Sequence, residues 1–565
     1  MATEAQDRPA ARAQTYVGSR VLRTEDPRFL TGAATYTDDI RLPGMLHAAF
    51  LRSPHAHARI TSIDTTRAAA VPGVSGVFTE ADLSRVLGLF ITELARPEVQ
   101  TITRPALNST SAYFVGQPIA VVVAESRYFA EDALEEIDVE YEVLPAMMDP
   151  DEAMRPDTPA FLPGLESNNH AHIEFQRGDV ERLFAEADHV FSRRLVHGRH
   201  MAAPLETRGV VADYRPATGE LTVWSSSQLP HYLRTFLAGP LGIAENKIRV
   251  IAESVGGGFG MKCIIFDEDG IIPAVSKLLG RPVKWTEDRY EHLAASSHAK
   301  DQVCEVEAAV TSDGRLLAFR GHFVGVGGAW PAHPWTGLVD PLCAAMLMPG
   351  IYDIEAAAFT VDCPLTNRAP IGPYRGIGWT AGHAVMQLLL DDVAHALGMD
   401  ATELRLRNAI PDEPFVSATG MSYDGGSYSA SIHKVLEMVD MPAFRERQAR
   451  LREEGRYLGI GISPYIEPTG WGAELSRIQG LPFEFFDSAS VTVEPDGSVT
   501  VTTGMQSHGQ SHETTFAQVA ADTLGVRFED VRVVQGDSAT AAYGNGTYAS
   551  RSAVIGGATI MRAGR

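Results

Sequence analysis

The sequence has few cysteines, and they are widely separated. The four are Cys263, Cys304, Cys343 and Cys363 in a chain of 565 residues. Zinc sites and iron–sulfur clusters need closely spaced thiolates, so the chain is predicted to hold neither. A disulfide framework is not expected in a chain of this length.

Long hydrophobic runs are also missing. No stretch approaches the roughly 18 consecutive apolar residues of a membrane-spanning helix, so no membrane span is predicted. The first 17 residues are polar and lack the apolar centre of a secretory signal, which predicts a disordered tail.

Basic residues are outnumbered, with 48 Lys and Arg against 71 Asp and Glu and a formal net charge of -23. Nucleic acids and anionic membranes attract clustered positive charge, so neither is expected as a partner. The 45% of hydrophobic residues indicates a globular protein. Together these values fit an acidic cytoplasmic enzyme, and a chain of this length would fold into about three or four domains.

Glycine is abundant and gathers in loops. Residues 256–262 read Gly-Gly-Gly-Phe-Gly-Met-Lys and follow a strand-like segment at 247–251. Ordering glycine costs extra chain entropy, so such a cluster suggests a loop that a ligand approaches closely. The loop matches neither the P-loop nor the dinucleotide fingerprint. A tight turn between two elements is the alternative.

Three further loops combine glycine with hydrogen-bond donors. Residues 504–515 enter a helix predicted at 516–524, and a helix N-terminus favours anions. Residues 373–378 place one arginine, whose fork suits phosphate or a planar polar ring, before a helix predicted at 383–397. Residues 544–552 crowd hydroxyl groups and an arginine beside glycines. Any one could be a polar surface turn, but together they predict an elongated, phosphate-bearing cofactor.

The chain predicts a mixed α+β organisation with an internal repeat. A buried strand (118–124), a helix (125–136) and a half-buried strand (137–143) follow one another near the N-terminus. Later, 216–250 and 495–533 share the order hairpin, strand, helix, Leu-Gly and strand. Two related α+β subdomains with a ligand between them would explain this similarity, and chance is the alternative.

These motifs occur in the same order in the molybdenum hydroxylases. They are Gly257-Gly258-Phe259-Gly260-x-Lys262, Tyr374-Arg375-Gly376-x-Gly378, Gly509-Gln510-x-x-Glu513-Thr514 and Gly546-Thr547-x-x-Ser550-Arg551-Ser552. From about residue 18 to the end, the chain resembles the large, molybdopterin-binding subunit of the xanthine dehydrogenase, aldehyde oxidase and carbon monoxide dehydrogenase family.

The resemblance implies an α+β fold in which an N-terminal α/β-hammerhead-like domain precedes two related molybdopterin-binding domains. The expected divisions are a tail at 1–17, the hammerhead domain at 18–145, a connector at 146–165, a first molybdopterin-binding domain at 166–430 and an incomplete second one at 431–565.

The resemblance also implies a molybdopterin cofactor in its cytosine dinucleotide form, with the metal held by the pterin and not by the protein. Such enzymes oxidise an aldehyde or N-heteroaromatic carbon with water as the oxygen source. Their electrons leave through [2Fe-2S] clusters and FAD. Since the cysteines exclude such clusters here, an iron–sulfur small subunit and an FAD medium subunit are expected as partners.

Carried over by position, the cofactor-binding residues implied by the resemblance are Gly257, Gly258, Phe259, Gly260, Arg375, Gln510, Thr547, Ala549, Ser550, Arg551 and Ser552. Cys263 and Trp379 are the residues expected near the substrate.

The sequence departs from the family at three places. Gly376 stands where carbon monoxide dehydrogenases carry a copper-binding cysteine, which disfavours CO oxidation. Cys263 stands where xanthine-type enzymes carry a substrate-binding glutamate, which disfavours purines. Many relatives carry a glutamine beside the metal in a stretch like 197–206, and this stretch contains none.

The family's general base, a glutamate in a Gly-x-Gly-Glu motif, is also not found in the sequence. By resemblance it is expected beyond Arg565, so no catalytic residue is assigned and the chain alone is predicted to be inactive. A C-terminal fragment on another polypeptide would complete the enzyme. The alternative is a non-catalytic scaffold with the same fold.

Overall fold

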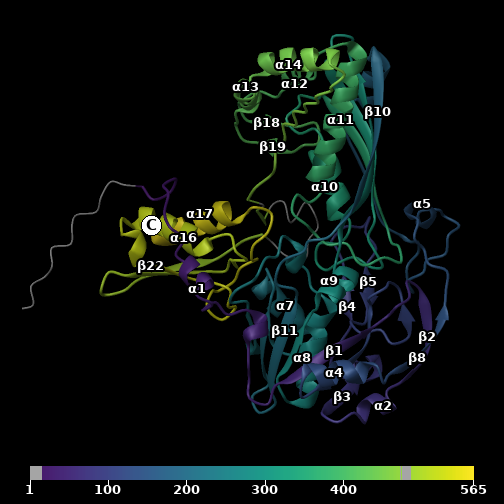
Figure 1. Cartoon of the computed structure of the whole chain (residues 1–565), viewed down its shortest axis with the longest axis vertical. Helices are drawn as coiled ribbons and strands as arrows, with labels where there is room; N and C mark the ends of the chain where they lie inside the picture. Colours follow the sequence, from purple (N-terminus) through teal and green to yellow (C-terminus); the bar gives the residue numbers. More distant parts are fainter. Residues whose placement is uncertain (1–14, 471, 474–484) are drawn as a thin grey trace, which may run out of the picture.

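The computed structural model describes residues 15–470, 472–473 and 485–565 and has the predicted α+β character (Figure 1). Two large sheets form the body of the molecule, and a smaller sheet with its helices projects from the side. The predicted tail at 1–17 falls mostly outside the described residues. Its last part is ordered, because the backbone N–H groups of Tyr16 and Val17 donate to the Asp522 carboxylate.

A seven-stranded sheet joins the N-terminal region to the region that follows it. Its strand order is β13-β12-β11-β14-β1-β7-β3. The strands are β1 (Leu46–Arg52), β3 (Val74–Phe78), β7 (Pro118–Ala124), β11 (Gly209–Arg215), β12 (Glu220–Ser225), β13 (Ile248–Ile251) and β14 (Val283–Thr286). The two regions meet where β1 pairs in parallel with β14, so the connector expected at 146–165 separates two halves of one sheet.

Every residue of β7 is buried, as the continuous apolar run predicted. Two small sheets complete the N-terminal region: β6 (Ser111–Ala112), β2 (Ala58–Asp64) and β8 (Asp138–Val143) form one, and β4 (Phe90–Thr92) and β5 (Ile102–Arg104) form the other. A third pair, β18 (Phe415–Val416) and β19 (Ser422–Tyr423), lies at the opposite end of the molecule beside the helices that follow residue 400 (Figure 1).

The second large sheet has five long strands in the order β10-β15-β16-β17-β9. They are β9 (Asn169–Arg177), β10 (His189–His200), β15 (Ala299–Val310), β16 (Leu316–Gly325) and β17 (Ala356–Pro364). Helices α10 (Val339–Leu347) and α11 (Trp379–Leu397) pack on one face of this sheet, and α6 (Val180–Glu186) covers one end of the other face.

The predicted internal repeat is present in the structure. The first unit is β11, β12, α7 (Pro230–Leu241) and β13, and the second is β20 (Ala489–Val493), β21 (Val499–Thr503), α16 (His512–Leu524) and β22 (Val531–Val534). In each unit the first two strands are antiparallel and the last two are parallel. Both helices end at a glycine in the left-handed conformation, which is common at helix C-termini.

The two units face each other directly. The N–H group of Ala252, after β13, donates to the carbonyl of Gly536 after β22 (2.7 Å), and Ser538 N–H donates to Val250 (2.9 Å). The loops that follow the parallel strands of both units therefore meet at one place.

The remaining helices of the described residues cover these sheets and their ends. They are α1 (Asp26–Leu30), α2 (Thr66–Ala69), α3 (Glu80–Leu83), α4 (Arg127–Leu134), α5 (Pro150–Ala153), α8 (Asp267–Leu279), α9 (Arg289–Ala295), α12 (Ala401–Arg407), α13 (Tyr428–Met438), α14 (Met441–Glu453) and α17 (Gly557–Gly564), which continues a π-helical turn at Ser552–Gly556.

Candidate cofactor site

The glycine-rich loop predicted after a strand lies directly after β13. Gly257 and Gly260 have φ angles of 93° and 101°, which glycine adopts without the penalty that a side chain brings. Phe259 between them also has a positive φ, of 55°, an uncommon conformation for a bulky residue. Its side chain is 43% exposed, so the strained residue presents its ring at the surface of the loop.

Two glycines of this loop are required by neighbouring protein atoms. A Cβ added at Gly258 would overlap the side-chain amide of Gln228, and one added at Gly260 would lie 2.9 Å from the carbonyl oxygen of Pro373. Part of the glycine content therefore lets this loop pack against two other segments, in addition to the close approach of a ligand predicted from the sequence.

Gln228 is the residue on which the loops converge. The residue is only 1% exposed. Its side-chain Oε1 accepts a hydrogen bond from Gly260 N–H (3.0 Å), and its Nε2 donates one to the carbonyl of Thr547 (2.6 Å). The same Nε2 lies 3.4 Å from His508 Nε2. One buried amide thus connects three of the four predicted loops.

Sequence reasoning missed Gln228 as a site residue because it looked for a glutamine in 197–206. A signal was available in the internal repeat. Gln228 lies three residues after β12, and Gln506 lies three residues after the equivalent β21. Gln506 is also buried, and its N–H donates to the hydroxyl of Thr547 (3.3 Å).

The fourth loop, 373–378, joins the others through its backbone. Arg375 N–H donates to the carbonyl of Phe259 (2.9 Å), and Lys300 Nζ donates to the carbonyl of Gly376 (2.6 Å). The side chain of Arg375 is exposed and makes no hydrogen bond or ion pair within the described ranges. Its guanidinium group is therefore available to a ligand beside Phe259.

The 504–515 loop is held largely by its own side chains. The Gln510 side chain is exposed, and its Oε1 accepts from His508 N–H (2.8 Å) while its Nε2 lies 3.1 Å from His512 Nε2. Burial lowers the pKa of His508 and of His512 to about 4, so both imidazoles are neutral near pH 7. Their ring nitrogens can then accept as well as donate hydrogen bonds.

The buried side chain of Arg551 stabilises the conformation of the 544–552 loop. This residue is 0% exposed; its guanidinium forms an ion pair with Asp487 and donates to the carbonyls of Gly546 (2.8 Å) and Phe486 (3.3 Å). Arg551 therefore holds the loop in shape, and its direct contact with a cofactor remains only a prediction. Thr547 and Ser552 lie together, with their hydroxyl oxygens 3.4 Å apart.

Several backbone donors at this junction are uncommitted. Among the described residues, the N–H groups of Gly258, Phe259, Ala549 and Ser550 donate no hydrogen bond. Ala549 and Ser550 have positive φ angles of 48° and 51°. Backbone strain of this kind tends to cluster at ligand sites. Free N–H groups beside an exposed guanidinium fit an anionic, polar cofactor.

A buried ion pair anchors the two ends of the glycine loop. Lys262 Nζ lies 2.9 Å from Glu206 Oε2, which also accepts from Gly256 N–H at 2.7 Å. Burial lowers the pKa of Lys262, and the nearby Glu206 carboxylate opposes that shift. Lys262 belongs to a motif recognisable in the sequence, whereas its pairing with Glu206 is visible only in the structure.

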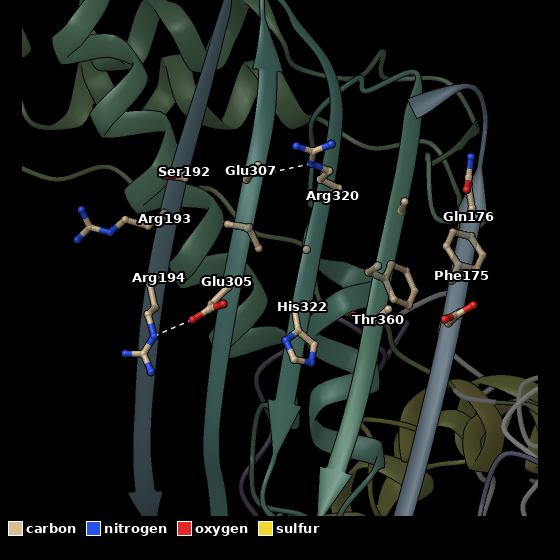
Figure 2. A pocket seen from close by; sticks show the side chains of 15 residues that line it. Phe175, Gln176, Ser192, Arg193, Arg194, Glu305, Glu307, Arg320, His322 and Thr360 are labelled. Carbon is tan, nitrogen blue, oxygen red and sulfur yellow. Dashed lines mark hydrogen bonds and ion pairs between the residues drawn. The ribbon is translucent and has the colours of Figure 1, made fainter. Parts of the chain in front are cut away.

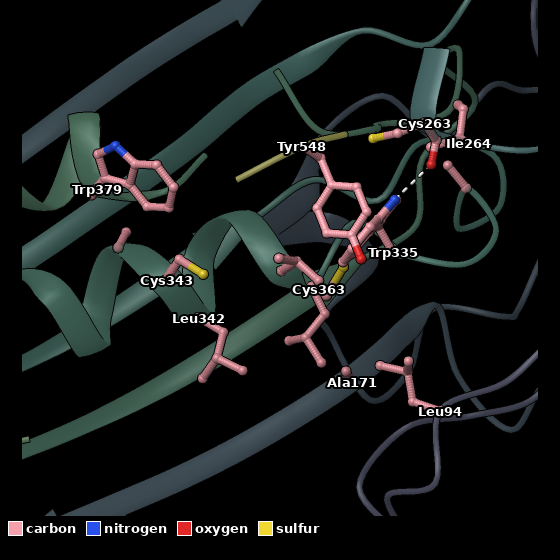
Figure 3. Packing of buried hydrophobic residues seen from close by; sticks show 14 of the residues in the cluster. Leu94, Ala171, Cys263, Ile264, Trp335, Leu342, Cys343, Cys363, Trp379 and Tyr548 are labelled. Carbon is pink, nitrogen blue, oxygen red and sulfur yellow. Dashed lines mark hydrogen bonds between the residues drawn. The ribbon is translucent and has the colours of Figure 1, made fainter. Parts of the chain in front are cut away.

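The two residues expected near the substrate lie in the core (Figure 3). Cys263 is buried, with its Sγ donating to the carbonyl of Gly260 (2.7 Å) and its own carbonyl accepting from Trp335 Nε1 (2.6 Å). Trp379 is buried at the start of α11. Both side chains are buried, so their contact with a substrate stays a prediction to which the structure adds no support.

A large hollow of about 830 Å³ lies elsewhere, on the open face of the five-stranded sheet (Figure 2). Arg194 pairs with Glu305 (2.9 Å) and Arg320 with Glu307 (2.6 Å) across its strands. None of the predicted cofactor-binding residues lines it. Across the described residues, no group of three or more His, Cys, Asp or Glu side chains is arranged to hold a metal ion.

Comparison with known families identifies the domains. Residues 31–145 match the aldehyde oxidase and xanthine dehydrogenase a/b hammerhead domain, and 163–409 and 434–565 each match a molybdopterin cofactor-binding domain. The nicotine 6-hydroxylase large subunit of Paenarthrobacter nicotinovorans is 41% identical over 97% of this chain and 67% of its own length. The chain belongs to the molybdenum hydroxylase family of xanthine dehydrogenase and aldehyde oxidase.

Other members of the molybdenum hydroxylase family agree. The carbon monoxide dehydrogenase large chain of Afipia carboxidovorans is 37% identical over 97% of this chain and 70% of its own length. Quinoline 2-oxidoreductase from Pseudomonas putida 86 is a solved structure with a TM-score of 0.94 and 41% identity, covering 98% of this chain and 70% of that one. The predicted family and fold are thus confirmed.

Among the residues that the structure describes, none of the helices has the length and apolar character needed to cross a membrane. The cytoplasmic location expected from composition remains a prediction.

Proposed function

We propose that the four loops around Gln228 hold a molybdopterin cofactor in its cytosine dinucleotide form. The observation that carries this proposal is their convergence. Gln228 connects Gly260, Thr547 and His508. The carbonyl of Phe259 joins the Arg375 loop to the glycine loop, and nearby backbone N–H groups make no hydrogen bond within the described residues. Anionic oxygen or sulfur atoms are the partners that such donors favour.

Each loop has a separate task in this proposal. The N–H groups of Gly258 and Phe259 donate to the metal end of the cofactor. Arg375 presents its exposed guanidinium group to the pterin end. Gln510, Thr547 and the 549–552 turn donate to the pterin and phosphate oxygens. When bound, the cofactor would supply the redox centre at which a carbon is hydroxylated with oxygen from water.

We propose an N-heteroaromatic compound or an aldehyde as the substrate. Two relatives carry names that refer to nitrogen heterocycles, nicotine and quinoline, and both share 41% of their aligned residues with this chain. Gly376 in place of a copper-binding cysteine supports this choice over carbon monoxide. Cys263 in place of glutamate supports it over purines.

We further propose that electrons leave through a separate [2Fe-2S] subunit and a separate FAD subunit. The support from this chain is its set of cysteines, all four of which are buried and distant in sequence. Relatives are named as large subunits or large chains, which fits such an assembly.

The 565 residues contain no Gly-x-Gly-Glu motif, which would supply the proton-accepting carboxylate in the family. We therefore propose that these residues bind the cofactor but do not turn over substrate alone. The loss of a general base lowers rates by about 10²–10⁴-fold. A glutamate carried on a further segment would complete the site.

The test is to express the chain with its partner subunits and measure reduction of an artificial electron acceptor with a panel of azaaromatics and aldehydes. We expect reduction with at least one azaaromatic or aldehyde when a segment carrying the glutamate is co-expressed, and none above background without it. Reduction by the 565 residues and partners alone would contradict the proposed inactivity. Activity with carbon monoxide only would contradict the proposed substrate class.

A further inference from the structure

Residues 15–31, here called the N-terminal strap, lie away from the strands of the N-terminal region and against the second cofactor-binding domain (Figure 1). Gln518 Nε2 donates to the carbonyl of Tyr16 (2.7 Å), and the rings of Tyr16 and Phe528 are 5.8 Å apart. With the Asp522 carboxylate accepting two backbone N–H groups of the strap, these contacts fix its beginning along α16.

The far end of the strap reaches the start of α16. Arg28 makes two parallel hydrogen bonds to the Glu513 carboxylate, at 2.5 and 2.6 Å, the geometry of a strong charge-assisted pair. Glu25 is only 3% exposed and accepts from the Thr514 hydroxyl. Arg23 donates to the carbonyl of Gly509 (3.3 Å).

These contacts account for two residues of a motif that the cofactor proposal leaves unused. In Gly509-Gln510-x-x-Glu513-Thr514, the last two side chains are directed at the strap. The strap therefore touches the loop on both sides of Gln510, at Gly509 before it and at Glu513 after it.

The strap continues into a segment fixed on the other half of the molecule. Asp38 accepts from Thr286 at the end of β14 (2.9 Å) and from Lys284 in the same strand. The segment from Tyr16 to Asp38 thus bridges the seven-stranded sheet and α16. Three of the four loops belong to these same two bodies: 256–262 follows β13 of the sheet, and 504–515 and 544–552 lie in the domain that contains α16.

We propose that the strap is a positioning element for the cofactor, with Arg28 and Glu25 holding the 504–514 loop in its ligand-binding shape. The inference rests on the proposed function. Without Arg28, Glu513 would lose its ion pair and the first turn of α16 would be free to move away from Gln510 and His508. The cofactor would then dissociate faster, while the fold of either body would change little.

The test uses the full chain with its partner subunits, and compares Arg28→Glu, Glu513→Arg and the double exchange. The matched control is Lys434→Glu, which breaks the exposed Lys434–Glu437 pair (2.9 Å) on α13, away from the strap. The first readout is the rate at which molybdenum and the cytosine dinucleotide, measured as cytidine monophosphate after hydrolysis of the retained cofactor, are lost during dialysis. The second is the melting temperature of cofactor-loaded and cofactor-free protein.

Each single exchange places like charges together, so we expect about tenfold faster cofactor loss. The double exchange should return the rate to within about threefold of wild type, and the control should leave it unchanged. Bound cofactor raises the melting temperature by mass action, so the difference between loaded and free protein should shrink in the single variants.

A strap that only packs would give a different result: both melting temperatures would fall equally and the loss rate would stay at the wild-type value, which would overturn the inference. If Arg28→Glu does not fold, Arg28→Gln serves as the milder variant, with the same criterion. If wild-type protein carries no molybdenum and no cytidine nucleotide, the proposed function fails first.

Discussion

At the scale of single residues, the site depends on close contacts that leave no room for a side chain. Gly546 has a φ of 74°, and a Cβ there would overlap the carbonyl group of Gln228. Gly242, the residue after α7, has a φ of 61° with nothing within 4 Å of an added Cβ. An alanine at either position would strain the backbone, but only an alanine at Gly546 would also clash with neighbouring atoms. A comparison of the two variants therefore separates these two costs.

We expect Gly546→Ala to destabilise the 544–552 loop by about 1–3 kcal/mol more than Gly242→Ala destabilises the end of α7, because only the former overpacks its surroundings. Both variants carry a similar left-handed strain of about 1–2 kcal/mol. Hydrogen exchange of the amides at 545–552 and 241–245 measures both effects. Equal losses of protection in the two variants would contradict the packing account.

Residue identities of the four loops were predictable, but their connections were not. The positive φ angles at Gly257 and Gly260 agree with the unusual glycine content of one segment. A lone glutamine after a strand has no such local signature, and only the internal repeat, through its match with Gln506, points to Gln228. Its importance comes from Thr547, 319 residues away.

At the scale of elements, the predicted helices and strands are largely present with shifted ends. The helix predicted at 516–524 begins at His512, and the one predicted at 383–397 begins at Trp379. Both start earlier because a residue with positive φ, Ser511 or Gly378, redirects the chain directly before the first turn. Such conformations depend on tertiary contacts and are not visible in hydrophobic periodicity.

The open face of the five-stranded sheet carries a charge cluster that predicts a pH dependence. Asp362 on β17 accepts from His322 Nε2 and His172 Nδ1, each at 2.7 Å. Burial would raise the pKa of Asp362, but these hydrogen bonds outweigh it and hold the pKa at about 2. The same hydrogen bonds raise the pKa of both histidines above the usual value.

The directions of these pKa shifts define the pH range in which the cluster stabilises the fold. The Asp362 contribution to stability is present above its unfolded pKa of about 4 and is lost as the pH falls towards 2. The histidine contributions are complete below about pH 6.5 and are lost as the pH rises through their elevated folded values.

Asp362→Asn should therefore destabilise the protein most near pH 5–6 and less at pH 9. The difference should be at most about 1 kcal/mol, because both imidazoles are more than a third exposed and solvent screens them. Thermal unfolding across this range measures it. Glu307→Gln, in the same sheet and paired with Arg320, is the control. A loss in Asp362→Asn that does not vary with pH would refute this explanation.

At the scale of the whole molecule, the sequence predicted the family, the α+β fold and the pair of related units. It did not predict that β1 and β14 unite the N-terminal region and the first cofactor-binding domain in one sheet. It also gave no sign that Arg28 would pair with Glu513, 485 residues away. Long-range pairings of this kind are decided by the packing of complete domains.

The central claim is that a molybdenum cofactor lies where the four loops meet. The most direct test is the anomalous diffraction signal of molybdenum in crystals of the cofactor-loaded protein. We predict one peak beside the backbone N–H groups of Gly258 and Phe259, on the side that Arg375 faces. A peak elsewhere, for example in the hollow of the five-stranded sheet, or no peak in protein shown to contain molybdenum, would contradict the account.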